Sequence, residues 1–329
     1  MYVLIIGHEN TKKQLNTATI SAKKRNMPLP HILLSGAAGC GKTSVARYVA
    51  DINSSPFLSV VPNSLKDYDE VLKILDRFDH SGYDQFGNRT GVIKPTILFI
   101  DEIHNLPMKG QELMGLVMEN FLLESNKPNK YYWVPFFTLI GATTISGKLS
   151  KPFRDRFKLT FNFQPYELED MVNIVIYHAS RLKVNITNIA SEEIAKRGRG
   201  TPRIVVGLVE RVRDYMLSIN SPVATRKIVT DVFDDLGIDE EGFTVLELRI
   251  LKVLFDTGLP VGLDNLSIIL QEDPKNIRDF AEPYLIRKGL ILVSGKGRII
   301  TEKGIQHLKS VGKTDKFMKQ EIEYNYERR

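Results

Sequence analysis

Three groups of residues in this chain have the types and spacing that phosphate chemistry needs. The first lies in "SGAAGCGKTS", where Gly36, Gly41, Lys42 and Thr43 fit the pattern G-x-x-x-x-G-K-S/T. The backbone N–H groups of such a loop, together with the start of the helix that follows, surround an anion. Lys42 can then reach the outer phosphates of a nucleotide, and the Thr43 hydroxyl can ligate Mg²⁺.

The second group is a pair of carboxylates in "PTILFIDEIHNL", where an apolar run leads into Asp101 and Glu102. Asp101 can hold the Mg²⁺ shell, and Glu102 can polarise a water molecule against the terminal phosphate. An acidic pair that merely caps the next helix is the alternative. The glycine loop upstream favours the catalytic interpretation.

The third group combines hydroxyl and guanidinium side chains. "FFTLIGATT" ends in Thr143 and Thr144, either of which could hold the attacking water, although β-branched residues are also common at strand ends. "KPFRDRF" contains Arg154 and Arg156, and an arginine near a phosphoryl group stabilises transition-state charge in cis or in trans. A solvated charge cluster is the alternative, and the sequence by itself favours it.

These side chains need a sheet to bring them together. The apolar runs at 30–35, 95–100 and 136–144 lack alternation, which predicts buried strands. Parallel strands that deliver polar groups at their C-terminal ends form a nucleotide-binding fold. Residues 166–198 have helical periodicity, and "GTPRI" predicts another helix with Arg203 in its first turn. A basic residue there opposes the helix dipole, so we expect it to have an anionic partner.

The C-terminal third has a different pattern. An acidic, glycine-containing stretch at 231–243 indicates a domain boundary, and helices are expected at about 244–256, 263–271 and 274–288. "LILVSGKGRIITEKG" then predicts two short strands around a basic turn, which is a winged-helix pattern. Lys296 and Arg298 on this turn could lie along a phosphate backbone. A solvated hairpin tip is the alternative.

Composition excludes some classes of protein. The net charge of +6 is compatible with nucleic-acid binding but also with many other soluble proteins. The single cysteine, Cys40, cannot form an internal disulfide, and we interpret it as a small loop residue in a reducing cytoplasm. No apolar run approaches the roughly 18 residues of a membrane span. We therefore expect a cytoplasmic protein without a membrane partner.

Taken in order, the motifs resemble those of the RuvB family, the AAA+ motors that drive branch migration of Holliday junctions with RuvA. The resemblance covers nearly the whole chain and is carried by "GKTS", "LFIDEIH", "FTLIGATT", "RDRF", "RGTPRI", "RVRDY", "EGF", "LPVGLDNL" and "EPYLI". It implies an α/β fold: an AAA+ P-loop domain with a parallel sheet at 1–160, a helical lid at 161–238, a winged-helix DNA-binding domain at 239–312 and a tail at 313–329.

The resemblance also implies a site for ATP and Mg²⁺ in an ATP-hydrolysing DNA helicase that forms a homo-hexamer. The nucleotide-binding positions are Gly36, Gly39, Gly41, Lys42, Thr43, Ser44, Ile5, Ile6, Tyr166, Pro202 and Arg203. The metal positions are Thr43 and Asp101, and Lys296 and Arg298 are the expected DNA contacts. Glu102, Asp101, Thr144 and Arg156 are the catalytic positions. Arg156 is the expected arginine finger, which acts on the nucleotide of the neighbouring subunit.

Several departures from the family pattern bear on partners. The chain begins almost at the box "IIGHEN", without the family's preceding Arg-Pro near the adenine. The segment between "MENF" and "PFF", which RuvA grips in the family, is shorter, so a RuvA-like partner stays open. The loop at 79–95 is longer, and Val293 stands where the family has another wing arginine.

Two functions therefore remain after the sequence alone. The first is a translocase that drives branch migration in DNA recombination and repair. The alternative is an ATP-switched DNA-binding loader or adaptor of a phage or mobile-element replication or recombination system. The intact motor residues argue against a non-catalytic relative.

Overall fold

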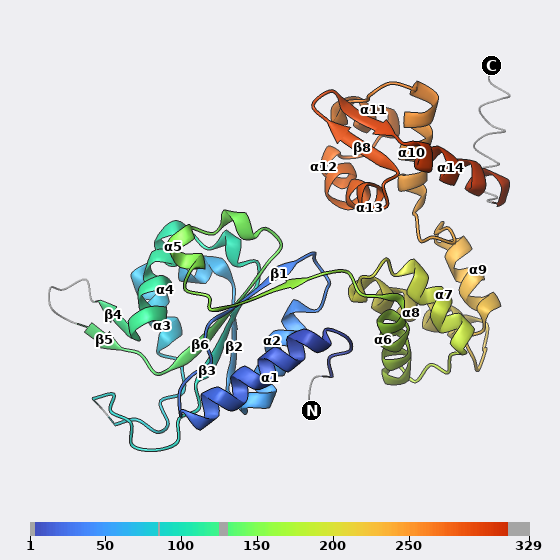
Figure 1. Cartoon of the computed structure of the whole chain (residues 1–329). Helices are drawn as coiled ribbons and strands as arrows, with labels where there is room; N and C mark the ends of the chain where they lie inside the picture. Colours follow the sequence, from blue (N-terminus) through green and yellow to red (C-terminus); the bar gives the residue numbers. More distant parts are fainter. Residues whose placement is uncertain (1–3, 85, 125–130, 315–329) are drawn as a thin grey trace. The chain divides into compact units, whose positions relative to one another are not determined.

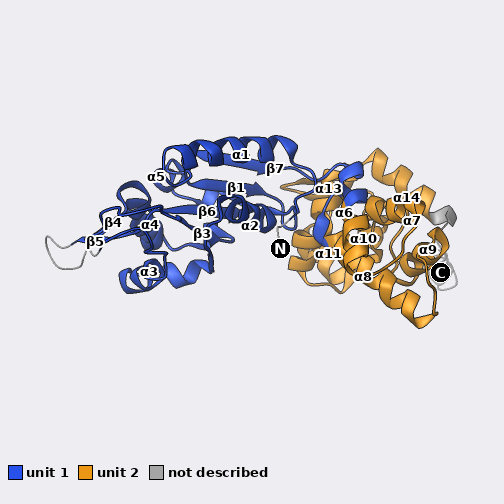
Figure 2. Cartoon of the chain, turned by 90° about the horizontal axis from the view of Figure 1, so that it is seen from below, with its two compact units in different colours: residues 1–173, 200–203 blue, residues 174–199, 204–329 orange. Residues whose placement is uncertain are grey.

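The computed structural model describes residues 4–84, 86–124 and 131–314, so nearly all of the expected tail at 313–329 lies outside the described residues. The chain divides into two compact units (Figure 2). One comprises Met1–Asn173 with Gly200–Arg203, and the other comprises Ile174–Arg199 with Ile204–Arg329. Within the described ranges, no helix is long and apolar enough to cross a bilayer.

The first unit contains a five-stranded sheet in the order β2-β3-β6-β1-β7, and every pairing in it is parallel. The strands are β1 (Ile32–Gly36), β2 (Phe57–Val60), β3 (Thr96–Ile100), β6 (Phe137–Thr143) and β7 (Leu159–Phe163). β3 and β6 are buried along their whole lengths. Such continuous apolar runs are expected when helices cover both faces of a parallel sheet, and the predicted nucleotide fold is confirmed.

Successive side chains of a strand point to opposite faces, and here they enter two separate cores. Leu98 and Leu139 pack in one core, whereas Phe99 and Ile140 pack in the other. The first core is covered by α3 (Tyr68–Leu75), α4 (Met108–Asn120) and α5 (Lys151–Arg154), and the second by α1 (Glu9–Lys24) and α2 (Lys42–Asn53) (Figure 1). The strands are thus fixed from both sides, which holds their C-terminal ends in one row.

The long loop at 79–95 packs against the antiparallel hairpin formed by β4 (Leu122–Glu124) and β5 (Tyr131–Trp133). The ring of Tyr83 lies 4.7 Å from that of Trp133. A Cβ atom on Gly87 would lie 2.5 Å from the same indole, so only glycine allows this approach. The loop at 79–95 therefore supports the hairpin.

The second unit is mostly helical. Its helices include α6 (Leu168–Arg181), α7 (Asn188–Arg197), α8 (Pro202–Ser218) and α9 (Arg226–Asp235), followed by α10 (Val245–Thr257), α11 (Leu263–Leu270), α12 (Pro274–Asn276), α13 (Glu282–Arg287) and α14 (Glu302–Thr314). The first residues of α6 and of α8 belong to the first unit. β8 (Ile291–Ser294) and β9 (Gly297–Ile300) pair antiparallel before α14. The expected winged-helix pattern is confirmed.

One expected helix is interrupted. The segment predicted at 274–288 contains a short π-helical segment, η4 (Ile277–Ala281), between α12 and α13. Pro283 follows this turn and has no N–H to donate to the carbonyl of Asp279. A wider turn at this point accommodates the missing hydrogen bond.

Candidate nucleotide site

The glycine loop has the backbone geometry of a phosphate cradle. β1 ends at Gly36 and α2 begins at Lys42, and Gly36, Gly39 and Gly41 all have positive φ angles, of 138°, 80° and 85°. A Cβ atom on Gly36 would lie 2.4 Å from the carbonyl oxygen of Phe163, so a side chain cannot fit there. Gly39 lies against Arg203, whose Cβ is 3.0 Å from where a Gly39 Cβ would stand. The loop thus brings Arg203 beside the cradle.

Lys42 lies inside this loop and is only 6% exposed. Its Nζ donates hydrogen bonds to the carbonyl oxygens of Gly36 and Ala37, at 2.7 and 2.9 Å. Burial lowers the pKa of Lys42, and the nearby carboxylate of Glu102 opposes that shift. The lysine and the carboxylate therefore share one site, although Lys42 begins α2 and Glu102 follows β3.

Thr144 and Glu102 meet because β3 and β6 are neighbouring parallel strands. The backbone N–H and the hydroxyl of Thr144 both donate to Oε2 of Glu102, at 3.2 and 3.0 Å. Asp101 is exposed at the same edge, and its Oδ1 accepts the Glu102 N–H at 3.0 Å. Thr143 is fully buried instead, so of the two threonines it is Thr144 that contacts the carboxylate.

Sequence reasoning missed His104. Its Nδ1 lies 3.1 Å from Oε2 of Glu102 and 3.0 Å from Oγ1 of Thr143, and its side chain is 8% exposed. The available signal was its position two residues after Glu102, in the short turn η2 (Ile103–Asn105) that follows β3.

The N-terminal box folds beside Tyr166. The ring of His8 lies 4.4 Å from that of Tyr166, and Gly7 packs against the same tyrosine. The Tyr166 hydroxyl stands 3.0 Å from the position of a Gly41 Cβ, and burial raises the pKa of this tyrosine. Ile5 is buried and Ile6 is half-buried in the same box. These residues form one wall next to the glycine loop.

The segment Gly200–Arg203, which belongs to the first unit, lies beside the same wall. The N–H of Tyr166 donates to the carbonyl of Gly200 at 2.9 Å, which places Pro202 and Arg203 at the start of α8 near the loop. Thr43 and Ser44 are exposed in the first turn of α2. The residues expected to bind the nucleotide are therefore brought together within the first unit.

Arg156 does not join this cluster. Its Nη2 pairs with Oε2 of Glu119 at 2.9 Å, and its Nη1 donates to the carbonyl of Pro152 at 2.6 Å. Among the described residues it is thus held against α4 and not against the glycine loop. Its assignment as an arginine finger stays a prediction.

The two wing residues differ in their surroundings. Lys296 is exposed at the turn between β8 and β9. Arg298 is 13% exposed and donates from Nε and Nη2 to the two oxygens of Glu282, at 2.6 and 3.1 Å. Its charge is therefore neutralised within the protein, whereas Lys296 forms no ion pair with any residue that the structure describes.

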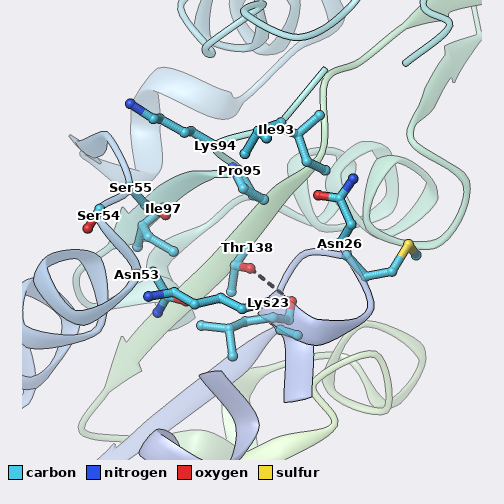
Figure 3. A pocket seen from close by; sticks show the side chains of 14 residues that line it. Lys23, Asn26, Asn53, Ser54, Ser55, Ile93, Lys94, Pro95, Ile97 and Thr138 are labelled. Atoms are coloured by element: carbon cyan, nitrogen blue, oxygen red, sulfur yellow. Dashed lines mark hydrogen bonds between the residues drawn. The ribbon is translucent and has the colours of Figure 1, made fainter. Parts of the chain in front are cut away.

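A hollow of the first unit lies elsewhere. A cavity of about 320 Å³ is lined by the ends of α1 and α2 and the start of β3, including Lys23, Asn53 and Pro95 (Figure 3). Thr138 at its floor donates to the carbonyl of Leu29 at 2.8 Å. This cavity is at the N-terminal edge of the strands. Because parallel sheets place ligands at the opposite edge, we do not assign it to the nucleotide.

The geometry also fits the implied cofactors. Three positive-φ glycines leave an open cradle of backbone donors, with Lys42 beside it. Among the described residues no group of three His, Cys, Asp or Glu side chains could hold a metal ion. Mg²⁺ keeps several waters and needs only one or two protein oxygens together with phosphates. The Thr43 hydroxyl and the Asp101 carboxylate are the oxygens expected for that role.

A parallel sheet with a glycine loop after one strand and a carboxylate pair after another, followed by a helical lid and a winged helix, defines a P-loop protein of the AAA+ class. Three family models match consecutive parts of the chain. They describe the Holliday junction DNA helicase RuvB P-loop domain at residues 2–163, the RuvB AAA lid domain at 166–239 and the RuvB C-terminal winged helix domain at 240–309. The chain belongs to the RuvB family.

Known relatives agree along nearly the full length. The RuvB subunit of the Holliday junction branch migration complex of Streptococcus uberis is 34% identical over 312 residues, covering 92% of this chain and 89% of that protein. The Thermotoga maritima RuvB subunit is 36% identical, with coverages of 92% and 89%. The solved structure of the Thermotoga maritima RuvB Holliday junction branch migration motor has a TM-score of 0.74 at 35% identity, covering 92% of this chain and 95% of that one.

Proposed function

We propose that this chain is an ATP-driven DNA translocase that drives branch migration of Holliday junctions. The observation that carries the proposal is the meeting of Glu102 and Thr144 beside the Lys42 loop, in a chain of the RuvB family. The domain division at 1–160, 161–238 and 239–312 is part of the proposal, and the ranges of the three matching family models support it.

Each residue of the site has a distinct task in ATP hydrolysis. The N–H groups of the glycine loop and Lys42 bind the phosphates, and Thr43 and Asp101 would hold Mg²⁺, which neutralises charge on the transferring phosphoryl group. Glu102 polarises the attacking water, and Thr144 fixes the carboxylate through two hydrogen bonds. Arg203 lies beside Gly39 and adds positive charge at the phosphates.

Assembly completes the site in this proposal. Arg156 pairs with Glu119 on α4. We propose that its guanidinium acts on the nucleotide of another subunit. A ring of identical subunits, which we propose to be a hexamer, supplies that arrangement. Arg156 then exchanges the carboxylate of Glu119 for the charge that develops on the neighbouring phosphates.

The winged helix binds the DNA backbone through Lys296, which is exposed at the wing. A RuvA-like partner is proposed for the β4–β5 hairpin, where Leu122, Tyr131 and Tyr132 are exposed. The relatives' name, a subunit of a branch migration complex, supports a second component. The tip of this hairpin at 125–130 lies outside the described residues.

Two variants test the chemistry. Lys42→Ala should lose ATP binding, because it removes the charge inside the phosphate loop. Glu102→Gln should hardly hydrolyse ATP, because the amide cannot accept a proton from water. It should still bind ATP, because Asp101 and the phosphate loop are intact. Nucleotide affinity, ATP turnover and strand exchange on a synthetic four-way junction are measured for each. Near-normal turnover by Glu102→Gln would refute the site. ATP binding and hydrolysis by the parent protein without strand exchange, with or without a RuvA-like protein, would instead indicate a loader or adaptor.

A further inference from the structure

The hydrogen bonds of Glu102 are distributed unequally between its two carboxylate oxygens. Oε2 receives the N–H of Thr144 at 3.2 Å, the hydroxyl of Thr144 at 3.0 Å, and lies 3.1 Å from Nδ1 of His104. Among the described residues, no hydrogen bond is made to Oε1. One oxygen is therefore anchored, and the other is left to interact with a ligand or a water molecule.

His104 is itself held in place. It lies in the short turn that follows Glu102, its side chain is 8% exposed, and Nδ1 is also 3.0 Å from Oγ1 of Thr143. That Thr143 oxygen in turn accepts the N–H of Ile145 at 3.0 Å. A carboxylate oxygen only accepts hydrogen bonds, so the contact with Glu102 requires the proton on Nδ1. The single Nδ1 proton is therefore shared between two nearby oxygens, Oε2 of Glu102 and Oγ1 of Thr143.

We propose that His104 is a positioning residue for ATP hydrolysis: its Nδ1–H anchors Oε2 of Glu102 so that Oε1 polarises the attacking water. The inference rests on the proposed function, in which Glu102 is the group that acts on water. A glutamate side chain has several rotatable bonds, and each bond left free reduces the time spent in the productive geometry. A misplacement of about 1 Å at a catalytic group can reduce a rate roughly 100-fold.

The matched variants differ only in where a donor stands. The amide of His104→Asn places an N–H near the position of Nδ1, that of His104→Gln places it farther out, and His104→Leu has similar bulk without a donor. We expect His104→Asn to keep kcat within about threefold of the parent, and His104→Gln and His104→Leu to lose about 10- to 100-fold. KM and the affinity for ATP should stay unchanged, because His104 contacts the carboxylate and not the phosphate loop.

A structural role would give a different result. Loss of fold would lower the melting temperature and affect ATP affinity in all three variants alike. Equal kcat in His104→Leu and the parent, or equal losses in His104→Asn and His104→Leu, would overturn the inference. Melting temperatures and ATP affinities measured alongside show whether a lost rate comes from an unfolded protein.

A double mutant separates this inference from the proposed function. If His104 acts through Glu102, adding His104→Leu to Glu102→Gln should cause no further loss in single-turnover hydrolysis of radiolabelled ATP. A further 10-fold loss would show that His104 acts elsewhere. If Glu102→Gln itself hydrolyses ATP normally, the proposed function fails. If Glu102→Gln is inactive but His104→Leu is fully active, only the role of His104 fails.

Discussion

Replacing Arg298 should destabilise the winged helix before it affects any DNA contact. Arg298 and Glu282 form a two-point ion pair, and their side chains are only 13% and 4% exposed. Removing one partner of a buried pair leaves an uncompensated charge, which costs about 3–5 kcal/mol. The matched winged-helix segment spans residues 240–309, and in a domain of that size 1 kcal/mol shifts the melting temperature by about 4–8 °C. Arg298→Met should therefore lower the melting temperature of this segment by at least about 12 °C.

The assay is thermal and urea unfolding of the full chain with four variants. Arg298→Met and Glu282→Gln should each be destabilised, whereas the double variant should be closer to the parent, because losing both buried charges is often nearly neutral. Lys296→Ala is the control. It is exposed on the same turn and should change stability by no more than about 0.5 kcal/mol.

DNA binding is then compared below all the melting temperatures. Lys296→Ala should lower affinity for all sequences and reduce the log–log salt slope by about one unit. The Arg298→Met and Glu282→Gln double variant should bind like the parent if the pair is structural. The reasoning is refuted if Arg298→Met melts with the parent, or if the double variant is as unstable as the single ones.

Two further predictions concern assembly and pH. If Arg156 acts in trans, Arg156→Ala should bind ATP but lose on the order of 10³–10⁵ in turnover. Mixing this variant with Lys42→Ala should restore some ATP hydrolysis. If confirmed mixed oligomers show no rescue, Arg156 does not act in trans. Burial alone would lower the pKa of His307, but its hydrogen bond to Asp239 and the charges of Asp239 and Glu241 outweigh burial and raise the pKa. This stabilisation is complete below the unfolded value of about 6.5 and is lost as pH rises through the folded value. The unfolding free energy of the parent should thus fall as the pH rises above about 6.5, and His307→Gln should flatten that slope. An unfolding free energy that rises over this pH interval in the parent but not in His307→Gln would contradict the prediction.

The sequence predicted the sheet and the glycine loop because both depend on local patterns. Apolar runs without alternation identify strands buried on both faces, and the loop requires glycine at fixed spacings. The partner of Arg298 could not be predicted in this way, because Glu282 lies in a different element and only packing brings the two together. A basic turn therefore indicated charge on the wing, but not which of its charges is free. His104 was missed for the same reason, since it lies in η2 and its partner Thr143 ends β6.

The backbone of Glu102 shows why this glutamate needs its neighbours. It has a φ angle of 46°, a left-handed conformation that costs a residue other than glycine about 1–3 kcal/mol. Such a conformation persists only where the surroundings stabilise it. Here Asp101 accepts the Glu102 N–H at 3.0 Å, and Thr144 and His104 hold the side chain from the other end. The strain, the anchored oxygen and the free oxygen are thus parts of one arrangement. Removing the Thr144 or the His104 contact should reduce hydrolysis more than it reduces ATP binding.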